Sequence, residues 1–284
     1  MLWRLFTSRQ GYRFGLCFLT ILIVSTMLVF VPQQASSVNL SDYYHYQCDM
    51  QDKQSNNPRF RFLTVSSLYV DRIAQRLCRS PVMAEHYSGV TISWKPRWLL
   101  SPTEVVNENY DLIWSRENAL RGLVPGYQHY YQLLMAFDNY KVYWFSKGQT
   151  PILEQAYFEN KRVGILTDRL SQTHHLLPLM SLKDANIQLS DQQLIAFDDA
   201  RNLYQAFATG EIDLMTGGDW LQREIDAPIS GLLISDKVNA ASLFIRKSHP
   251  PAVDCALVRV METYQETLLN THIQPDIDIH CDAS

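Results

Sequence analysis

The feature of this sequence that most constrains its fold is a regular alternation of short apolar strands and amphipathic helices, which begins near residue 59. Residues 59–65 and 162–166 are short apolar runs typical of strands. Residues 69–79 and 198–208 space their apolar side chains as half-buried helices do. Further strands are expected at residues 90–94, 110–114, 140–145, 212–216 and 241–245, and further helices at residues 103–107, 173–183 and 252–269. Because strands joined by helices form mainly parallel sheets, the pattern predicts an α/β protein.

The N-terminal segment predicts export. Arg4, Arg9 and Arg13 precede an uncharged apolar run over residues 14–31, and a basic region followed by such a run is typical of an export signal. The run is 18 residues long, close to the ~17 that span a bilayer. Residues 1–37 are therefore either a cleaved signal peptide or an uncleaved transmembrane helix. In both cases the rest of the chain is expected in the periplasm, tethered to the inner membrane by residues 14–31 if the segment is kept.

Cysteine usage agrees with an oxidising compartment. Four of the five cysteines lie beyond the apolar run, and an even number there indicates two disulfide bonds. The simplest pairing along the chain is Cys48–Cys78 and Cys255–Cys281, although two other pairings stay open. A plain core role for Cys78 and Cys255 stays open as well. No CxxC or HxxxH spacing occurs, so no metal site is expected.

Charge excludes one class of function. The chain carries 25 Lys+Arg against 29 Asp+Glu, a net charge of −4, and removal of the three leader arginines shifts this to −7. An acidic domain of this kind does not neutralise a row of phosphates, so nucleic-acid binding is not expected. Residues 38–57 are polar and include QDKQSNNP, which predicts an arm or linker before the fold begins at Pro58.

Polar or small side chains follow four of the expected strands. In open α/β sheets, ligands bind beyond the carboxyl ends of strands, where helix N-termini offer unpaired N–H groups. The candidate ligand-binding residues are therefore Ser66, Ser67, Trp114, Ser115, Arg116, Ser171, Gln172, Thr173, Gly217 and Asp219. Several have a plainer alternative: Ser66, Ser67, Ser171, Gln172 and Thr173 as helix caps, Arg116 as a surface charge beside Glu117, and Trp114 in the core.

Three motifs in order carry a resemblance to a known superfamily. Residues 160–164 (NKRVG), 207–213 (FATGEID) and 244–247 (FIRK) resemble segments of the type 2 periplasmic solute-binding proteins, which include the extracellular family 3 and phosphonate-binding proteins. The resemblance implies a hinged fold of two α/β lobes with the ligand between them. Lobe one would comprise residues 58–141 plus 242–284, and lobe two residues 142–241.

The resemblance also implies a function and its limits. Such a protein captures a small polar molecule and hands it to an ABC transporter permease, or reports it to a membrane sensor kinase or cyclase. Amino-acid-binding members carry a TxxR segment after the strand that corresponds to residues 110–114. Here residues 115–127 read SRENALRGLVPGY, and no Thr lies three positions before Arg116 or Arg121. The carboxylate clamp of the family is therefore not transferred to this chain.

Two other functions remain as alternatives. The first is a dehydratase-type enzyme of the same fold, with Glu117, Asp168 or Asp219 in proton transfer. The second is a ligand-free accessory protein that docks a partner through its Tyr-rich arm or through residues 127–131. No GxSxG, HExxH, P-loop or GxGxxG motif occurs, so no catalytic residue and no cofactor are expected. The adjacent His174 and His175 point about 100° apart on a helix and are not expected to share an ion.

Overall fold

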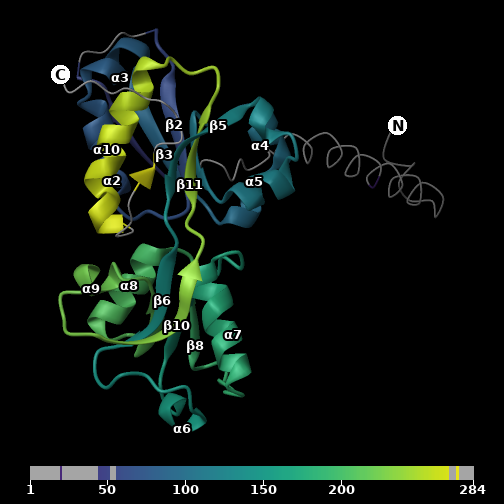
Figure 1. Ribbon diagram of the computed structural model, residues 1–284, viewed down its shortest axis with the longest axis vertical. Coiled ribbons are helices and arrows are strands. Elements are labelled where there is room, and N and C mark those ends of the chain that lie inside the picture. Colours follow the sequence, from purple (N-terminus) through teal and green to yellow (C-terminus); the bar gives the residue numbers. More distant parts are fainter. Residues whose placement is uncertain (1–19, 21–43, 52–55, 269–272, 275–284) are drawn as a thin grey trace, which may run out of the picture. The chain divides into compact units, whose positions relative to one another are not determined.

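The computed structural model describes residue 20 and residues 44–51, 56–268 and 273–274 of the chain. From residue 44 onward the chain folds around two β-sheets (Figure 1). The predicted leader over residues 1–37 lies outside the described residues except for Thr20, and Cys281 lies outside them too. Within the described ranges, no helix has both the length and the apolar character that a bilayer span requires.

The first sheet has the strand order β1-β3-β2-β4-β11-β5-β12. Its strand β2 runs parallel to β3 and β4, and the other pairings are antiparallel. We call this sheet and its helices the first lobe. The strands are β1 (His45–Asp49), β2 (Arg59–Thr64), β3 (Gly89–Trp94), β4 (Leu112–Ser115), β5 (Tyr131–Phe137), β11 (Ser242–Arg246) and β12 (Ile273–Gln274).

Helices cover both faces of the first sheet (Figure 1). One face carries α2 (Val70–Cys78), α3 (Pro81–His86) and α10 (Ala252–Leu268), which share a buried cluster with the strands. The other carries α4 (Pro102–Val106) and α5 (Glu117–Leu123) over a second cluster. Two short 3₁₀ turns, η2 (Arg97–Leu99) and η3 (Tyr127–His129), complete the lobe.

The second sheet has the strand order β10-β6-β9-β7-β8, and with its helices it forms the second lobe. Strand β7 runs parallel to β8 and β9, whereas β6 runs antiparallel to β9 and β10. The strands are β6 (Tyr140–Ser146), β7 (Val163–Leu166), β8 (Leu194–Phe197), β9 (Leu214–Gly217) and β10 (Ser230–Val238). The helices are α6 (Gln155–Phe158), the π-helix η4 (Gln172–Leu176), α7 (Leu177–Asp184), α8 (Ala200–Thr209) and α9 (Leu221–Glu224).

The expected α/β class is observed, but both sheets are mixed rather than mainly parallel. Each contains three parallel strands, β3-β2-β4 and β8-β7-β9, to which antiparallel strands are added. The chain passes from the first sheet to the second between β5 and β6 and returns between β10 and β11 (Figure 1). The antiparallel pairing of β11 with β4 and β5, and of β6 with β9 and β10, arises at these crossings, because the strands that enter and leave each lobe run against the strands they join. The terminal strands β1 and β12 add further antiparallel pairs to the first sheet.

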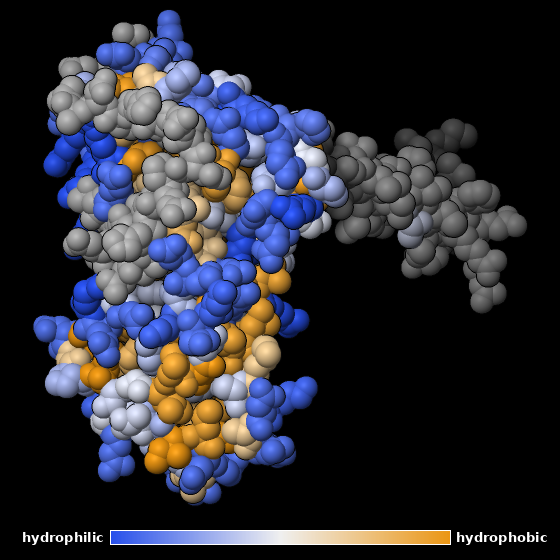
Figure 2. All heavy atoms as spheres, viewed as in Figure 1, coloured by the Kyte–Doolittle hydropathy of each residue, from blue (hydrophilic) through white to orange (hydrophobic). Residues whose placement is uncertain are grey.

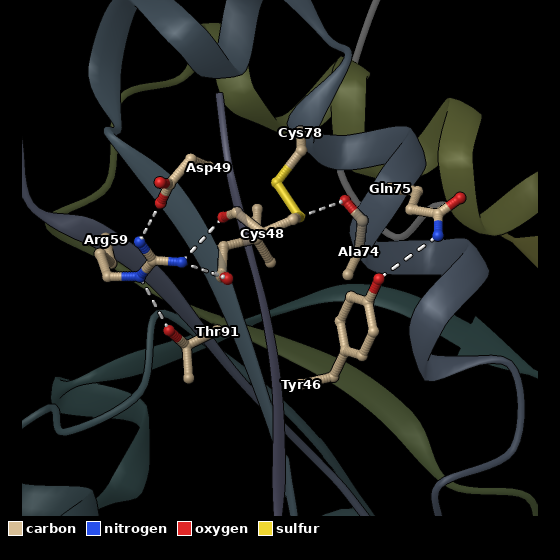
Figure 3. The surroundings of a disulfide bond; sticks show 9 residues. Tyr46, Cys48, Asp49, Arg59, Ala74, Gln75, Cys78 and Thr91 are labelled. Atoms are coloured by element: carbon tan, nitrogen blue, oxygen red, sulfur yellow. Dashed lines mark hydrogen bonds and ion pairs between the residues drawn. A yellow bond between two sulfur atoms is a disulfide. The ribbon is translucent and has the colours of Figure 1, made fainter. Parts of the chain in front are cut away.

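One strand lies where the sequence indicated a polar arm. Strand β1 pairs antiparallel with β3, and a disulfide joins Cys48 to Cys78 of α2 across 6.3 Å between their Cα atoms (Figure 3). Arg59 donates to the backbone oxygens of Cys48 and Val90 at 2.8 and 2.9 Å, and to Asp49 at 2.6 Å. The strand was missed because its stability comes from these distant partners and not from an apolar run.

The second predicted disulfide is only partly described. Cys255 is disulfide-bonded, whereas Cys281 lies outside the described residues, so the Cys255–Cys281 pairing stays a prediction.

Apolar residues gather on part of the second lobe in Figure 2. Exposed apolar side chains of this lobe include Leu176 and Met180, near and on α7, and Leu233 on β10. The first lobe, by contrast, exposes Trp98, which is 60% accessible and lies beside the candidate site described next.

Candidate functional site

A cavity of about 140 Å³ lies between the two lobes, and residues of both form its wall. Five of the ten candidate ligand-binding residues line it: Ser66, Trp114, Arg116, Ser171 and Thr173. They come from loops that follow β2, β4 and β7, or from the ends of those strands. The carboxyl ends of the parallel strands therefore meet at this cavity, as the fold class implies.

The other five candidates lie elsewhere. Ser67 is bonded to Asp199, and Ser115 lines a neighbouring groove. Gln172, Gly217 and Asp219 are not on the cavity wall. For all ten residues, contact with a ligand stays a prediction.

Two guanidinium groups form one end of the cavity. Arg97 pairs through Nη1 with Asp168 Oδ2 of the second lobe at 2.5 Å. Its Nε is buried and has no hydrogen-bond partner among the described residues. A buried donor without a partner costs about 1–3 kcal/mol, so this atom favours an acceptor supplied from the cavity.

Arg116 holds the same end from the first lobe. Its Nε donates to the backbone oxygen of Asn239 at 3.1 Å, in the return crossing, and Nη1 donates to that of Leu170 at 3.5 Å. Burial lowers the pKa of Arg116, and the nearby charge of Arg97 lowers it further. The guanidinium stays protonated at neutral pH. Two cations therefore face one carboxylate, Asp168, at this end.

A chain of hydrogen bonds saturates the polar groups on the second-lobe wall. Burial lowers the pKa of His174 to about 4, so its ring is neutral at pH 7. Its Nδ1 lies 2.7 Å from the carbonyl oxygen of Thr216 and must donate to it, which leaves Nε2 to accept from Tyr204 at 3.3 Å. The Tyr204 oxygen accepts in turn from Trp220 Nε1 at 3.0 Å. These groups are therefore already hydrogen-bonded within the protein, whereas the Nε of Arg97 has no partner among the described residues.

The π-helix η4 presents two consecutive side chains to the cavity. Thr173 and His174 both line it, and both are buried. The Thr173 hydroxyl lies 2.7 Å from the phenol oxygen of Tyr140, and the Thr173 carbonyl accepts from Thr216 at 2.5 Å. A widened helical turn of this kind is frequent at functional sites. Thr173 was expected at the site, whereas His174 was considered only as a possible metal ligand together with His175 and was not named as a candidate.

Tyr69 and Glu224 also line the cavity. Tyr69 precedes α2 in a left-handed conformation with φ of 59°. This conformation is uncommon for a residue with a side chain and is often found at ligand sites. Burial, and then Glu224, raise the pKa of Tyr69 well above its ordinary value. The cavity wall thus contains an acidic side chain as well as the two guanidinium groups.

Beside the cavity, Asp199 bonds the two lobes directly. Its Oδ2 accepts from the backbone N–H of Ser67 at 2.8 Å, and its Oδ1 accepts from the Ser67 hydroxyl at 3.0 Å. The same carboxylate caps α8 through the N–H of Arg201 at 2.7 Å. Ser67, in the loop before α2, was expected to bind a ligand. Its backbone N–H and its hydroxyl are instead hydrogen-bonded to the carboxylate of Asp199.

Sequence reasoning missed Arg97, Tyr69, Tyr140, Tyr204 and Glu224. Arg97 lies three residues after β3, and that position beyond a parallel strand was the signal that could have identified it. Tyr204 was read as one of the buried residues of α8, and it is buried; its hydroxyl nevertheless reaches the cavity wall. Among the described residues, no group of three His, Cys, Asp or Glu side chains is placed to hold a metal ion.

No family model matches this sequence, and no curated protein does. Solved structures are similar in fold. The binding protein component of an ABC phosphonate transporter from Pseudomonas aeruginosa has 12% identity and a TM-score of 0.52, over 78% of this chain and 83% of that one. An L-arginine-bound substrate-binding protein of an amino acid ABC transporter from Streptococcus pneumoniae has 13% identity and a TM-score of 0.42, over 74% and 90%. A Xanthomonas citri protein bound to ATP has 13% identity and a TM-score of 0.43, over 78% and 92%.

At 12% identity the first of these likenesses concerns the fold alone. The chain has the fold of the type 2 periplasmic solute-binding proteins, and the resemblance stated from its motifs is confirmed at that level.

Proposed function

We propose that the protein is an exported solute-binding protein that captures a small anionic ligand in the cavity between its lobes. The observation that carries the proposal is the pair of guanidinium groups, Arg97 and Arg116, at one end of that cavity. Asp168 balances one of the two charges, and the buried Nε of Arg97 remains available. A carboxylate, phosphate or phosphonate would supply both the missing charge and the missing acceptor.

Size and wall chemistry restrict the group that enters the cavity. A volume of about 140 Å³ suits a group of roughly the bulk of a benzene ring. Trp114, Tyr140 and Trp220 supply aromatic walls. Glu224 in the same wall favours a ligand that also carries a cationic group or a hydrogen-bond donor.

Delivery to an ABC permease is the role that the comparisons favour. The phosphonate and amino acid neighbours are named as binding components of ABC transporters, and closure of two lobes on a ligand is the motion such a fold allows. The proposal assigns no catalytic step to the protein.

A thermal-shift panel tests the binding role. We would use inorganic phosphate, methylphosphonate, acetate, glycine and L-alanine on the exported part of the chain. A ligand present at 100 times its Kd should stabilise the fold by about 2.7 kcal/mol. The Arg116→Gln variant should weaken binding of the responding anion about 10- to 100-fold, because it removes a charge-assisted contact.

Arg121→Gln is the matched control. Arg121 lies on α5, pairs with Glu117 and is 59% exposed, so the same substitution there should leave the binding constant unchanged. Equal affinity in the wild-type protein and the Arg116→Gln variant would contradict the assigned role of Arg116. Failure of every anion to bind would contradict the proposed function.

A further inference from the structure

A second, larger hollow adjoins the cavity. It has a volume of about 350 Å³ and shares the residues Thr64, Val65, Arg97 and Trp114 with the cavity wall. Arg97 therefore lies at the boundary, with its guanidinium between the two spaces. We call this second hollow the apolar groove.

Aliphatic side chains dominate the wall of the apolar groove. Leu63, Ile113 and Leu120 are buried in its wall, and Leu100 and Leu123 lie beside them. Lys95 also lines the groove, but its ammonium group lies 2.6 Å from Glu104 and is only 6% exposed, so its charge is already neutralised. The groove therefore presents a surface that suits hydrocarbon.

Both lobes contribute apolar side chains to this groove that remain in contact with water. Trp98 of the first lobe is 60% exposed, and Leu170 of the second lobe is 46% exposed. Leu170 is held in place by the site itself, since its carbonyl accepts from Arg116 and its N–H donates to Asp168 Oδ1 at 3.1 Å. The residues proposed to bind the anion thus also position one wall of the groove.

We propose that the apolar groove is the second half of the ligand site, and that the ligand is an amphiphilic anion. Its charged head lies in the cavity between Arg97 and Arg116, and its alkyl or aromatic tail lies in the groove. This inference rests on the proposed function, because the head occupies the same cavity. A small polar ligand alone would leave the groove, Trp98 and Leu170 hydrated, whereas a tail would remove them from water.

Small residues of α5 make room for the tail. Ala119 and Gly122 both line the groove and are three positions apart on one helical face. A Cβ placed on Gly122 would meet nothing within 4 Å. A larger side chain at this position therefore has space to enter the groove without displacing its neighbours.

A homologous series of probes tests the inference. Binding of n-alkylphosphonates from methyl to octyl, and of the corresponding n-carboxylates, would be measured by calorimetry below their aggregation concentrations. Each methylene buried in the groove should tighten binding about fourfold, the factor that corresponds to about 0.8 kcal/mol per CH₂. The gain should end at the length that fills the groove.

The Gly122→Leu variant should reduce the dependence of affinity on alkyl chain length, because the leucine side chain occupies the groove. The ratio of octyl to methyl affinity should then fall toward one. Gly148→Leu is the matched control: Gly148 is exposed in the second lobe, also has nothing within 4 Å of a built Cβ, and is remote from the groove. The affinities of Gly148→Leu should depend on chain length as those of the wild-type protein do.

The outcomes separate the two proposals. Affinity that does not change with chain length, or that rises equally in Gly122→Leu, overturns the amphiphilic ligand and leaves the anion-binding function intact. Absolute affinities that are the same in Arg116→Gln and in the wild-type protein at every chain length overturn the role of Arg116 in binding the anionic head. Failure of every probe to bind overturns both.

Discussion

Asp199 and Asp168 each form a contact between the lobes beside the cleft, and the two contacts differ in how completely their polar groups are satisfied. Asp199 accepts from Ser67 of the opposite lobe and from Arg201 of its own helix, so both of its carboxylate oxygens are engaged within the protein. Asp168 also reaches the opposite lobe, yet the buried Nε of its partner Arg97 has no acceptor among the described residues. The first contact closes the lobes by itself, whereas the second leaves a place for a ligand. An incomplete set of hydrogen bonds is thus a better indicator of a binding site than the presence of charge.

The largest effect is expected for Arg97→Ala, which tests whether the contact between Arg97 and Asp168 stabilises the protein. The substitution leaves Asp168, which is 5% exposed, without its cationic partner. Removing one member of a buried pair costs about 3–5 kcal/mol, so urea unfolding should show a loss of that order. Adding Asp168→Asn should restore part of the stability, since it removes the unpaired charge. A loss below about 1 kcal/mol in Arg97→Ala would mean that the contact is not a significant link between the lobes.

Acid should lower the free energy of unfolding through His174, which lines the cavity. Burial lowers the pKa of His174 to about 4 in the folded protein, whereas in the unfolded chain it titrates near ~6.5. As the pH falls below 6.5 the unfolded state takes up the proton first. The contribution of the neutral ring is therefore complete above about pH 6.5 and is lost toward pH 4, by about 3 kcal/mol.

The measurement is the pH dependence of the unfolding free energy in the wild-type protein minus that in His174→Asn, which keeps an amide nitrogen near the position of Nδ1. The difference isolates His174 from the carboxylates that also titrate in acid. Identical slopes in the two proteins between pH 4 and 6.5 would show that the ring is not buried as described.

Asp199→Ala should have the next largest effect. It removes a helix cap, worth about 1 kcal/mol, and leaves the Ser67 N–H without its acceptor, so a total loss of about 2 kcal/mol is expected. Asp199→Asn keeps a capping oxygen and should cost about half as much. The adjacent Asp198 is exposed and accepts only solvent-exposed hydrogen bonds, from Tyr44 and Asn202 at 3.1 Å each. Asp198→Ala should therefore cost only about 0.5 kcal/mol. Equal losses at positions 198 and 199 would remove the distinction between the two contacts.

The smallest effect is expected at the surface, beside the same contact. Asp71 lies 3.6 Å from Arg201, and both side chains are about half exposed. Asp71→Asn should therefore cost about 0.5 kcal/mol or less, and less still in 1 M salt. A salt-independent loss of about 2 kcal/mol would show that this pair is itself a significant link between the lobes.

The sequence predicted best what neighbouring residues decide. A half-buried helix was expected over residues 198–208, and α8 begins after the cap Asp199 with Ala200, Leu203, Tyr204 and Phe207 buried. A helix was also expected over residues 103–107, and α4 begins there with a capping box formed by Ser101 and Glu104. Such features depend on side chains one helical turn apart, so a local pattern is sufficient to find them.

The cleft depends instead on partners that are distant in sequence. Arg97 and Asp168 are 71 residues apart, and Ser67 and Asp199 are 132 apart. The expectation that a ligand binds beyond the carboxyl ends of the strands identified Ser66 and Arg116, which do line the cavity. It could not tell that Ser67 is already occupied by a carboxylate, or that the π-helix would turn His174 toward Tyr204. These outcomes are set by which loops face each other across the cleft.

The position of β11 has a consequence for how the chain acquires its structure. This strand lies between β4 and β5 in the first sheet, although it follows the whole second lobe in the sequence. Until residues 242–246 have been synthesised, β4 and β5 lack the strand that joins them. During that wait, the disulfide between Cys48 and Cys78 can hold only the β1, β2, β3 and α2 portion together. We therefore expect the first lobe to begin folding before the second and to finish after it.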